Sequence, residues 1–110
     1  TFDSVAEMAW FRLEGNSLAL LAETDDATTD RDDQATGITL VADTYYHFTI
    51  DFTQGTSAIG FYVDDSLVVT LNATALTTSM LMQPFVAIQK STGTGSQSIT
   101  VDQIRVTGVR

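Results

Sequence analysis

The most regular alternation of apolar and polar positions lies between residues 45 and 71. Residues 45–52, YYHFTIDF, keep a period of two over eight positions, and residues 59–63, IGFYV, repeat it after the turn TQGTS. Such alternation predicts strands with one buried face, and the short glycine-containing linker predicts that they form a hairpin. Residues 66–71, SLVVTL, follow the Asp64-Asp65 turn as a third strand. The predicted core is the apolar face of this hairpin: Tyr46, Phe48, Ile50, Phe52, Ile59, Phe61 and Val63.

Shorter alternating or apolar runs extend the pattern towards both ends of the chain. Further strands are predicted at residues 8–14, 17–23, 37–41, 83–90 and 98–109. Gly15-Asn16 supplies a two-residue turn between the first two, because both residues tolerate positive φ. Residues 72–82 hold one helical turn at most, and no segment of twelve residues keeps a 3.6-residue period. We therefore predict an all-β fold, an antiparallel β-sandwich of seven or eight short strands.

The charge balance restricts the partners of the protein. The 110 residues carry 14 Asp and Glu against 5 Lys and Arg, a net charge of −9, which repels nucleic acids and anionic lipid surfaces. The absence of cysteine excludes disulfides and Cys-based zinc sites, and no apolar run approaches the roughly 20 residues that span a bilayer. We expect residues 1–110 to be one domain, the C-terminal part of a longer chain, with neither nucleic acid nor membrane as a partner.

Several of these strands resemble those of a known superfamily. YHFTIDF (46–52) followed by IGFYVDDSLV (59–68) resembles the paired strands of concanavalin A-like jelly rolls, which include laminin-G modules, legume-lectin-type domains and laminarinase-type β-glucanases. QPFVAIQKSTG (83–93) and ITVDQIRV (99–106) resemble two later strands of the glucanases. The resemblance implies a jelly-roll topology, and because complete jelly rolls of this kind are longer, N-terminal strands can be missing here. Jelly rolls of this type also occur in structural proteins of bacteriophage virions.

The catalytic pattern of the glucanases is incomplete in this chain. Those enzymes carry a Glu-x-Asp-x-Glu strand, which places three carboxylates on one face for nucleophilic and acid–base roles. The nearest match is Glu23-Thr24-Asp25, and Ala27 stands where the third acid would be. His47 is the single histidine, so no pair of imidazoles can form within the chain. We therefore expect no catalytic residues and no enzymatic activity.

Two clusters of side chains are candidate binding sites. An acidic loop at residues 23–37 offers hard oxygen ligands that suit calcium, although its charges equally suit a solvated, self-repelling loop without metal. The candidate calcium ligands are Asp25, Asp30, Asp32 and Asp33. Aromatic residues with polar tips can stack on sugars, but they also occur routinely at sandwich edges. The candidate sugar-stacking residues are Trp10, Tyr45 and Tyr62.

A third candidate is the apolar run Met80, Leu81 and Met82, which lies in a connection. If buried, it plugs one end of the sandwich, which is the interpretation we favour; if exposed, it is a contact for a protein partner. Together with the resemblance, these features predict a non-enzymatic structural or assembly protein on a virion surface, such as a bacteriophage capsid decoration, bound to the capsid shell or to itself. The alternative is an extracellular carbohydrate-binding module, lectin-like or laminin-G-like, with calcium as an optional cofactor.

Overall fold

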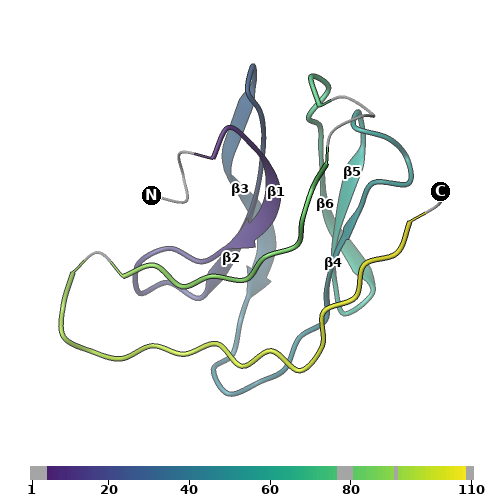
Figure 1. Ribbon diagram of the computed structural model, residues 1–110. Coiled ribbons are helices and arrows are strands. Elements are labelled where there is room, and N and C mark those ends of the chain that lie inside the picture. Colours follow the sequence, from purple (N-terminus) through teal and green to yellow (C-terminus); the bar gives the residue numbers. More distant parts are fainter. Residues whose placement is uncertain (1–4, 77–80, 91, 109–110) are drawn as a thin grey trace.

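The computed structural model describes residues 5–76, 81–90 and 92–108 and contains six strands in two sheets (Figure 1). The strands are β1 (Glu7–Arg12), β2 (Ala19–Asp26), β3 (Asp30–Thr39), β4 (Phe48–Asp51), β5 (Ile59–Val63) and β6 (Ser66–Leu71). The first sheet has the order β1-β2-β3 and the second the order β4-β5-β6, with antiparallel pairing throughout. In the described chain no helix is long and apolar enough to cross a membrane. The all-β, antiparallel prediction is confirmed.

The predicted hairpin and its third strand form as the sequence pattern indicates. Asp64 and Asp65 connect β5 to β6 with φ values of 48° and 65°, the left-handed conformation that a tight hairpin turn requires and that Asp tolerates better than most residues. The Asp64 carboxylate also accepts the backbone N–H of His47 (2.9 Å), while the Asp64 N–H donates to the His47 carbonyl (2.8 Å). These two bonds fix the chain where it enters β4.

The core lies between the two sheets, which face each other like the layers of a sandwich (Figure 1). Its buried members are Ala22, Ile59, Phe61, Leu71, Ala73 and Leu76. Phe61 is completely buried, and the ring of Phe11 from the first sheet packs edge-on against it with the ring centroids 5.2 Å apart. Further contacts between the sheets run from β2 and β3 to β6. Interdigitated side chains from both inner faces therefore hold the two layers together.

The core predicted from the hairpin is correct in its alternation but only partly in its burial. Ile59, Phe61 and Val63 of β5 are buried. Phe48 and Phe52, on the same face, are 42% and 38% exposed. The reason is that β4 is an edge strand, so its side chains lack a neighbour on one side.

The acidic stretch at residues 23–37 is not an open loop, as we predicted, but a β-hairpin. The ends of β2 and β3 are paired as far as Asp25 with Asp30, and only residues 27–29 form the turn. Side-chain oxygens hold this turn, since Asp25 accepts the N–H of Ala27 (2.8 Å) and Asp26 accepts that of Thr29 (2.7 Å). Such local bonds to backbone N–H groups stabilise the turn although the neighbouring carboxylates repel each other.

The strands predicted at residues 83–90 and 98–109 are wrong for the described residues, because neither segment belongs to a sheet. Residues 81–90 and 92–108, called here the C-terminal segment, run past β1, bend at residues 92–94 and then run towards β4 (Figure 1). Alternation fixes which side chains share a face, but a strand also needs a backbone partner. In the predicted helical turn at 72–82, residues 73–76 form a hydrogen-bonded turn, Leu76 N–H to Ala73 carbonyl (3.0 Å); residues 77–80 lie outside the described residues.

The connections among the six strands do not establish the jelly-roll topology that the resemblance implies. Both sheets are meanders of consecutive strands, and the link between them is the segment at residues 40–47. In a jelly roll, successive strands instead cross between the two sheets. The fold established for the described chain is therefore two three-stranded antiparallel sheets.

Candidate functional site

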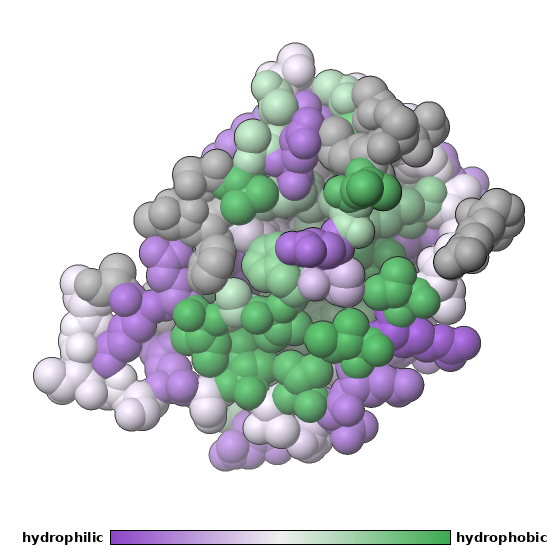
Figure 2. Space-filling view, in the orientation of Figure 1, coloured by the Kyte–Doolittle hydropathy of each residue, from purple (hydrophilic) through white to green (hydrophobic). Residues whose placement is uncertain are grey.

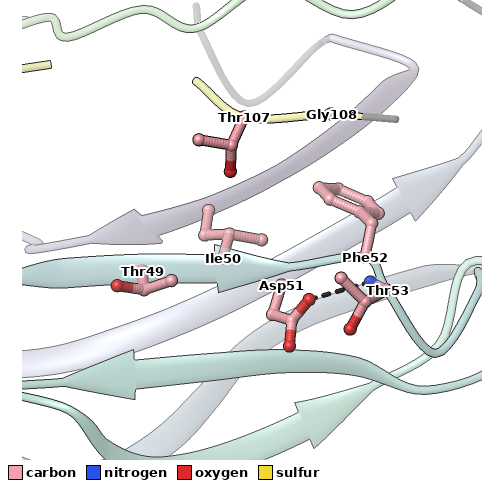
Figure 3. Close-up of a pocket in the computed structure, with 7 residues that line it drawn as sticks. All are labelled: Thr49, Ile50, Asp51, Phe52, Thr53, Thr107 and Gly108. Atoms are coloured by element: carbon pink, nitrogen blue, oxygen red, sulfur yellow. Dashed lines mark hydrogen bonds between the residues drawn. The ribbon is translucent and has the colours of Figure 1, made fainter. Parts of the chain in front are cut away.

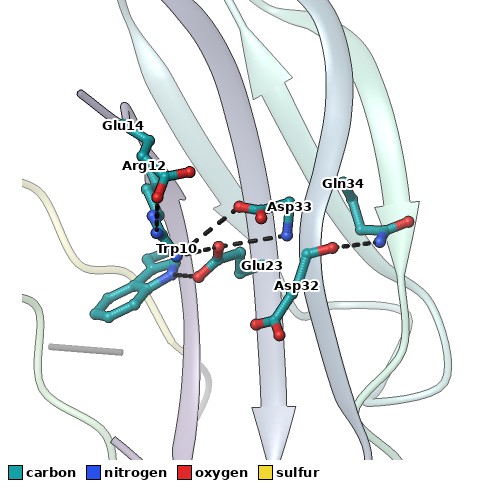
Figure 4. A network of polar contacts seen from close by, with 7 residues as sticks. All are labelled: Trp10, Arg12, Glu14, Glu23, Asp32, Asp33 and Gln34. Atoms are coloured by element: carbon teal, nitrogen blue, oxygen red, sulfur yellow. Dashed lines mark hydrogen bonds and ion pairs between the residues drawn. The ribbon is translucent and has the colours of Figure 1, made fainter. Parts of the chain in front are cut away.

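A buried carboxylate lies on the outer face of the first sheet (Figure 4). Ala9 and Phe11 pack against the core, so the alternation of β1 turns Trp10 and Arg12 to the other face, where Trp10 is paired with Glu23 of β2. The Glu23 carboxylate accepts hydrogen bonds from Trp10 Nε1 and Arg12 Nη1, both at 2.6 Å, and from a backbone N–H of β3 at 3.3 Å. One side chain thus connects all three strands of the sheet.

This network binds the three strands of the first sheet together. Glu23 is completely buried, and this burial raises the pKa of its carboxyl group, although the bond from Trp10 and the charge of Arg12 oppose the shift. Arg12 also pairs with the exposed Glu14 at 3.1 Å. A substrate therefore cannot reach the Glu23 carboxylate, which is one of the two acids in the pair Glu23 and Asp25. The sequence did not indicate that Glu23 would be buried.

The predicted calcium ligands do not gather around one point. Asp25 and Asp30 face each other across the β2–β3 pair. Desolvation, together with the neighbouring carboxylates, first that of Asp32, raises the pKa of Asp30 to about 6. The backbone N–H of Asp33 donates a hydrogen bond to the Glu23 carboxylate. Within the described part of the chain, no three His, Asp or Glu side chains are placed to hold a metal ion together.

Asp26, which the sequence analysis did not single out, joins the two sheets. Its buried carboxylate accepts the N–H groups of Thr28 (3.0 Å) and Thr29 (2.7 Å) in the β2–β3 turn and that of Ala75 (2.9 Å) after β6. These bonds, first that from Ala75, lower the pKa of Asp26. Nearby, the Thr24 hydroxyl donates to the Asn72 carbonyl (2.9 Å). Asp26 followed by Ala27, Thr28 and Thr29 is typical of a turn that an Asp side chain holds, but nothing local indicated the bond to Ala75.

The three candidate sugar-stacking residues do not form one platform. Trp10 lies on the outer face of the first sheet, where its ring meets that of Phe85 edge-on with the centroids 5.7 Å apart. Tyr62 alternates with the buried Phe61 and therefore lies on the outer face of the second sheet. Tyr45 precedes β4 and is 70% exposed. Because Trp10 and Tyr62 point away from opposite sides of the sandwich, the two rings cannot face the same sugar.

An apolar surface lies on the side bordered by the edge strands β1 and β4, called here the open side. Figure 2 shows apolar residues gathered where the C-terminal segment crosses the view, with hydrophilic residues around them. The exposed apolar residues of that segment are Leu81, Met82, Phe85, Val86, Ile88, Ile99, Val101, Ile104 and Val106. Leu81 is 98% exposed, so our interpretation of the run 80–82 as a buried plug is wrong for Leu81 and Met82. Met80 lies outside the described residues.

The far end of the C-terminal segment comes close to β4. Thr107 and Gly108 line an open hollow of ≈ 660 Å³ together with residues 49–53 (Figure 3). Ile50 and Phe52 point towards Thr107, whereas Asp51 turns away. The N–H of Thr53 donates to the Asp51 carboxylate (2.8 Å) and lowers the pKa of Asp51. The edge of β4 therefore presents apolar side chains to a strand-like segment that has not joined it.

Comparisons of the chain with models of protein families, with curated proteins and with solved structures find no match in any of the three.

Proposed function

We propose that this protein is a non-enzymatic assembly module that docks on other protein subunits through the C-terminal segment and the open side. The observation that carries the proposal is the row of exposed apolar side chains in residues 81–108. Large contiguous apolar surfaces on a folded domain mark interaction sites. The polar networks around Glu23 and Asp26 fasten the sheets themselves and leave this surface as the main feature that is not used within the fold.

The setting that we propose for this assembly is a virion surface, where the protein would decorate a capsid shell or associate with further copies of itself. The resemblance of residues 46–68 to the paired strands of concanavalin A-like jelly rolls supports this setting, because jelly rolls of this type also occur in structural proteins of bacteriophage virions. The acidic β2–β3 hairpin supports it physically, since charged loops keep the outward side of a decoration solvated while an apolar side docks. The jelly-roll topology is part of the same proposal, because residues 83–90 beside β1 and 98–108 beside β4 would supply the strands that cross between the sheets.

The test compares two double variants of equal charge. Val101→Asp with Ile104→Asp removes two exposed apolar side chains of the C-terminal segment. Thr100→Asp with Gln103→Asp adds the same charges at exposed polar positions of the same stretch. We would record the particle size of the purified protein and of material from its source by light scattering and electron microscopy, with circular dichroism to verify folding.

We expect the wild type and the Thr100/Gln103 variant to form particles larger than the 11.9 kDa chain, and the Val101/Ile104 variant to remain monomeric. The reason is that two aspartates at buried interface positions lose their hydration without a partner. A wild-type protein that is monomeric at every concentration, and is absent from any particle in its source, would refute the proposal. Equal behaviour of the two double variants would show that the apolar positions are not the contact.

A further inference from the structure

The C-terminal segment has the features of a strand without a sheet. Its apolar residues alternate with polar ones, as in Ile99 and Val101 with Thr100 and Asp102 between them. They are about half exposed or more, and the segment belongs to neither sheet in the described chain. Strand-like segments in this state are donors for pairing with an exposed sheet edge.

The sandwich carries two matching acceptors on its open side. β1 and β4 are the end strands of their sheets, so each has one edge without a strand neighbour among the described residues. Half-exposed Phe48 and Phe52 line the inner face beside the β4 edge. A donated strand would cover these rings as well as pair with the backbone.

Contacts within one copy already bring the segment close to both edge strands. Phe85 lies against Trp10 of β1, and Thr107 lines the hollow beside Thr49 of β4. Even so, the segment does not become a fourth strand of either sheet. A second copy of the chain presents the same two edges and the same segment, and an exchange between two copies gives each one a donor and an acceptor in a symmetric pair.

The distribution of charge also selects a partner of this kind. Residues 1–80 carry two basic against thirteen acidic side chains, a net charge of −11, whereas residues 81–110 carry three basic against one acidic, a net charge of +2. Glu7 begins β1 and Asp51 ends β4, while Lys90 and Arg105 lie in the segment. A partner for the open side should be extended, apolar and basic, and the C-terminal segment has these three properties.

We infer that two copies of this chain exchange their C-terminal segments, so that residues 83–90 of one copy pair with β1 of the other and residues 98–108 pair with β4. This inference rests on the proposed assembly function and names its first step, a symmetric dimer. The dimer would have two four-stranded sheets in each half and would bury the apolar residues of both segments.

The absence of native cysteines permits a direct test by cross-linking between full-length chains. A Thr49→Cys chain with one affinity tag is mixed with a Thr107→Cys chain that carries another tag, and a short bismaleimide is added. The control mixture replaces Thr49→Cys by Thr70→Cys, an exposed threonine on β6, the opposite edge of the same sheet. The product is a chain pair that carries both tags, measured on a denaturing gel.

We expect at least about tenfold more doubly tagged product from the Thr49 mixture than from the Thr70 mixture, because groups held in one complex have an effective concentration in the millimolar range. A Thr49→Cys, Thr107→Cys double variant that cross-links only within a monomeric chain would overturn the inference. Large particles without the Thr49–Thr107 product would also overturn it and would leave the assembly function standing. A monomer in all these experiments, with no particle in its source, would overturn both.

Discussion

Phe61 fills the centre of the interface between the two sheets, and its replacement by alanine should lower the free energy of unfolding by about 4 kcal/mol. The side chain is completely buried among residues of both layers, and truncation of a buried Phe costs roughly 3–5 kcal/mol because apolar contacts are lost and a cavity remains. The edge-on contact with Phe11 places the value in the upper half of this range. A domain of this size has roughly 5–15 kcal/mol in all, so the variant should still fold but melt roughly 15–25 °C lower.

The matched control is Phe48→Ala, the same substitution on the neighbouring strand. Phe48 shares the inward face but is 42% exposed, so its truncation removes a smaller buried area, leaves no enclosed cavity and should cost about 1–2 kcal/mol. Urea unfolding followed by far-ultraviolet circular dichroism measures both values. A loss below about 1 kcal/mol for Phe61→Ala would refute the packing, since the register of β5 would then be shifted by one residue. Equal and large losses for both variants would show that the open side is covered in solution.

Three further predictions concern single positions. Gly60→Ala should destabilise the folded protein by about 1–3 kcal/mol, because a Cβ there would lie 2.7 Å from the Tyr62 ring. In thermal melts this loss of stability should be smaller when Gly60→Ala is made in a Tyr62→Ala background. An unchanged loss would contradict the clash. Asp26 has a pKa below its ordinary 3.8 in the folded protein. The stability that its ionised carboxylate provides is therefore present above pH 3.8 and is lost as the pH falls below 3.8. Melting temperatures of Asp26→Asn should therefore lack part of the wild-type drop between about pH 4 and pH 2, and identical slopes would refute this. Asp30 has its pKa raised to about 6, so the folded protein binds its proton more tightly than the unfolded chain and loses stability as the pH rises from about 4 to 6. Asp30→Asn should match the wild type near pH 4 and melt higher at pH 7; parallel profiles would contradict the shift.

The part of the fold that could be predicted is the part fixed by short-range pattern. Alternation over residues 45–71 gave the right faces for β4 and β5, and Asp64-Asp65 gave the right turn to β6. Both signals act within one hairpin, so they need no knowledge of distant partners. Burial of Phe48 and Phe52 was overestimated because it depends on what lies beyond β4, which alternation does not specify.

Distant partners account for most of what the sequence did not indicate. The acidic hairpin is held by Asp26, whose carboxylate reaches Ala75, 49 positions away. Charge repulsion was the stronger visible signal, and it predicted an open loop. Glu23 was predicted at the end of a strand that enters this loop, and nothing local indicated that Trp10 and Arg12 enclose it from β1. Alternation in the C-terminal segment predicted strand-like side-chain faces without identifying a backbone partner.

The arrangement of both sheets as meanders determines the order in which the protein becomes compact during its synthesis. No strand pairing spans more than the 20 positions between Ala19 and Thr39, so each sheet depends on rapid, local chain closure. The first sheet can therefore be complete while β5 and β6 are still inside the ribosome, and its apolar inner face is then uncovered. The acidic β2–β3 hairpin is already present on this intermediate, and its charges oppose aggregation of nascent chains until the second sheet arrives.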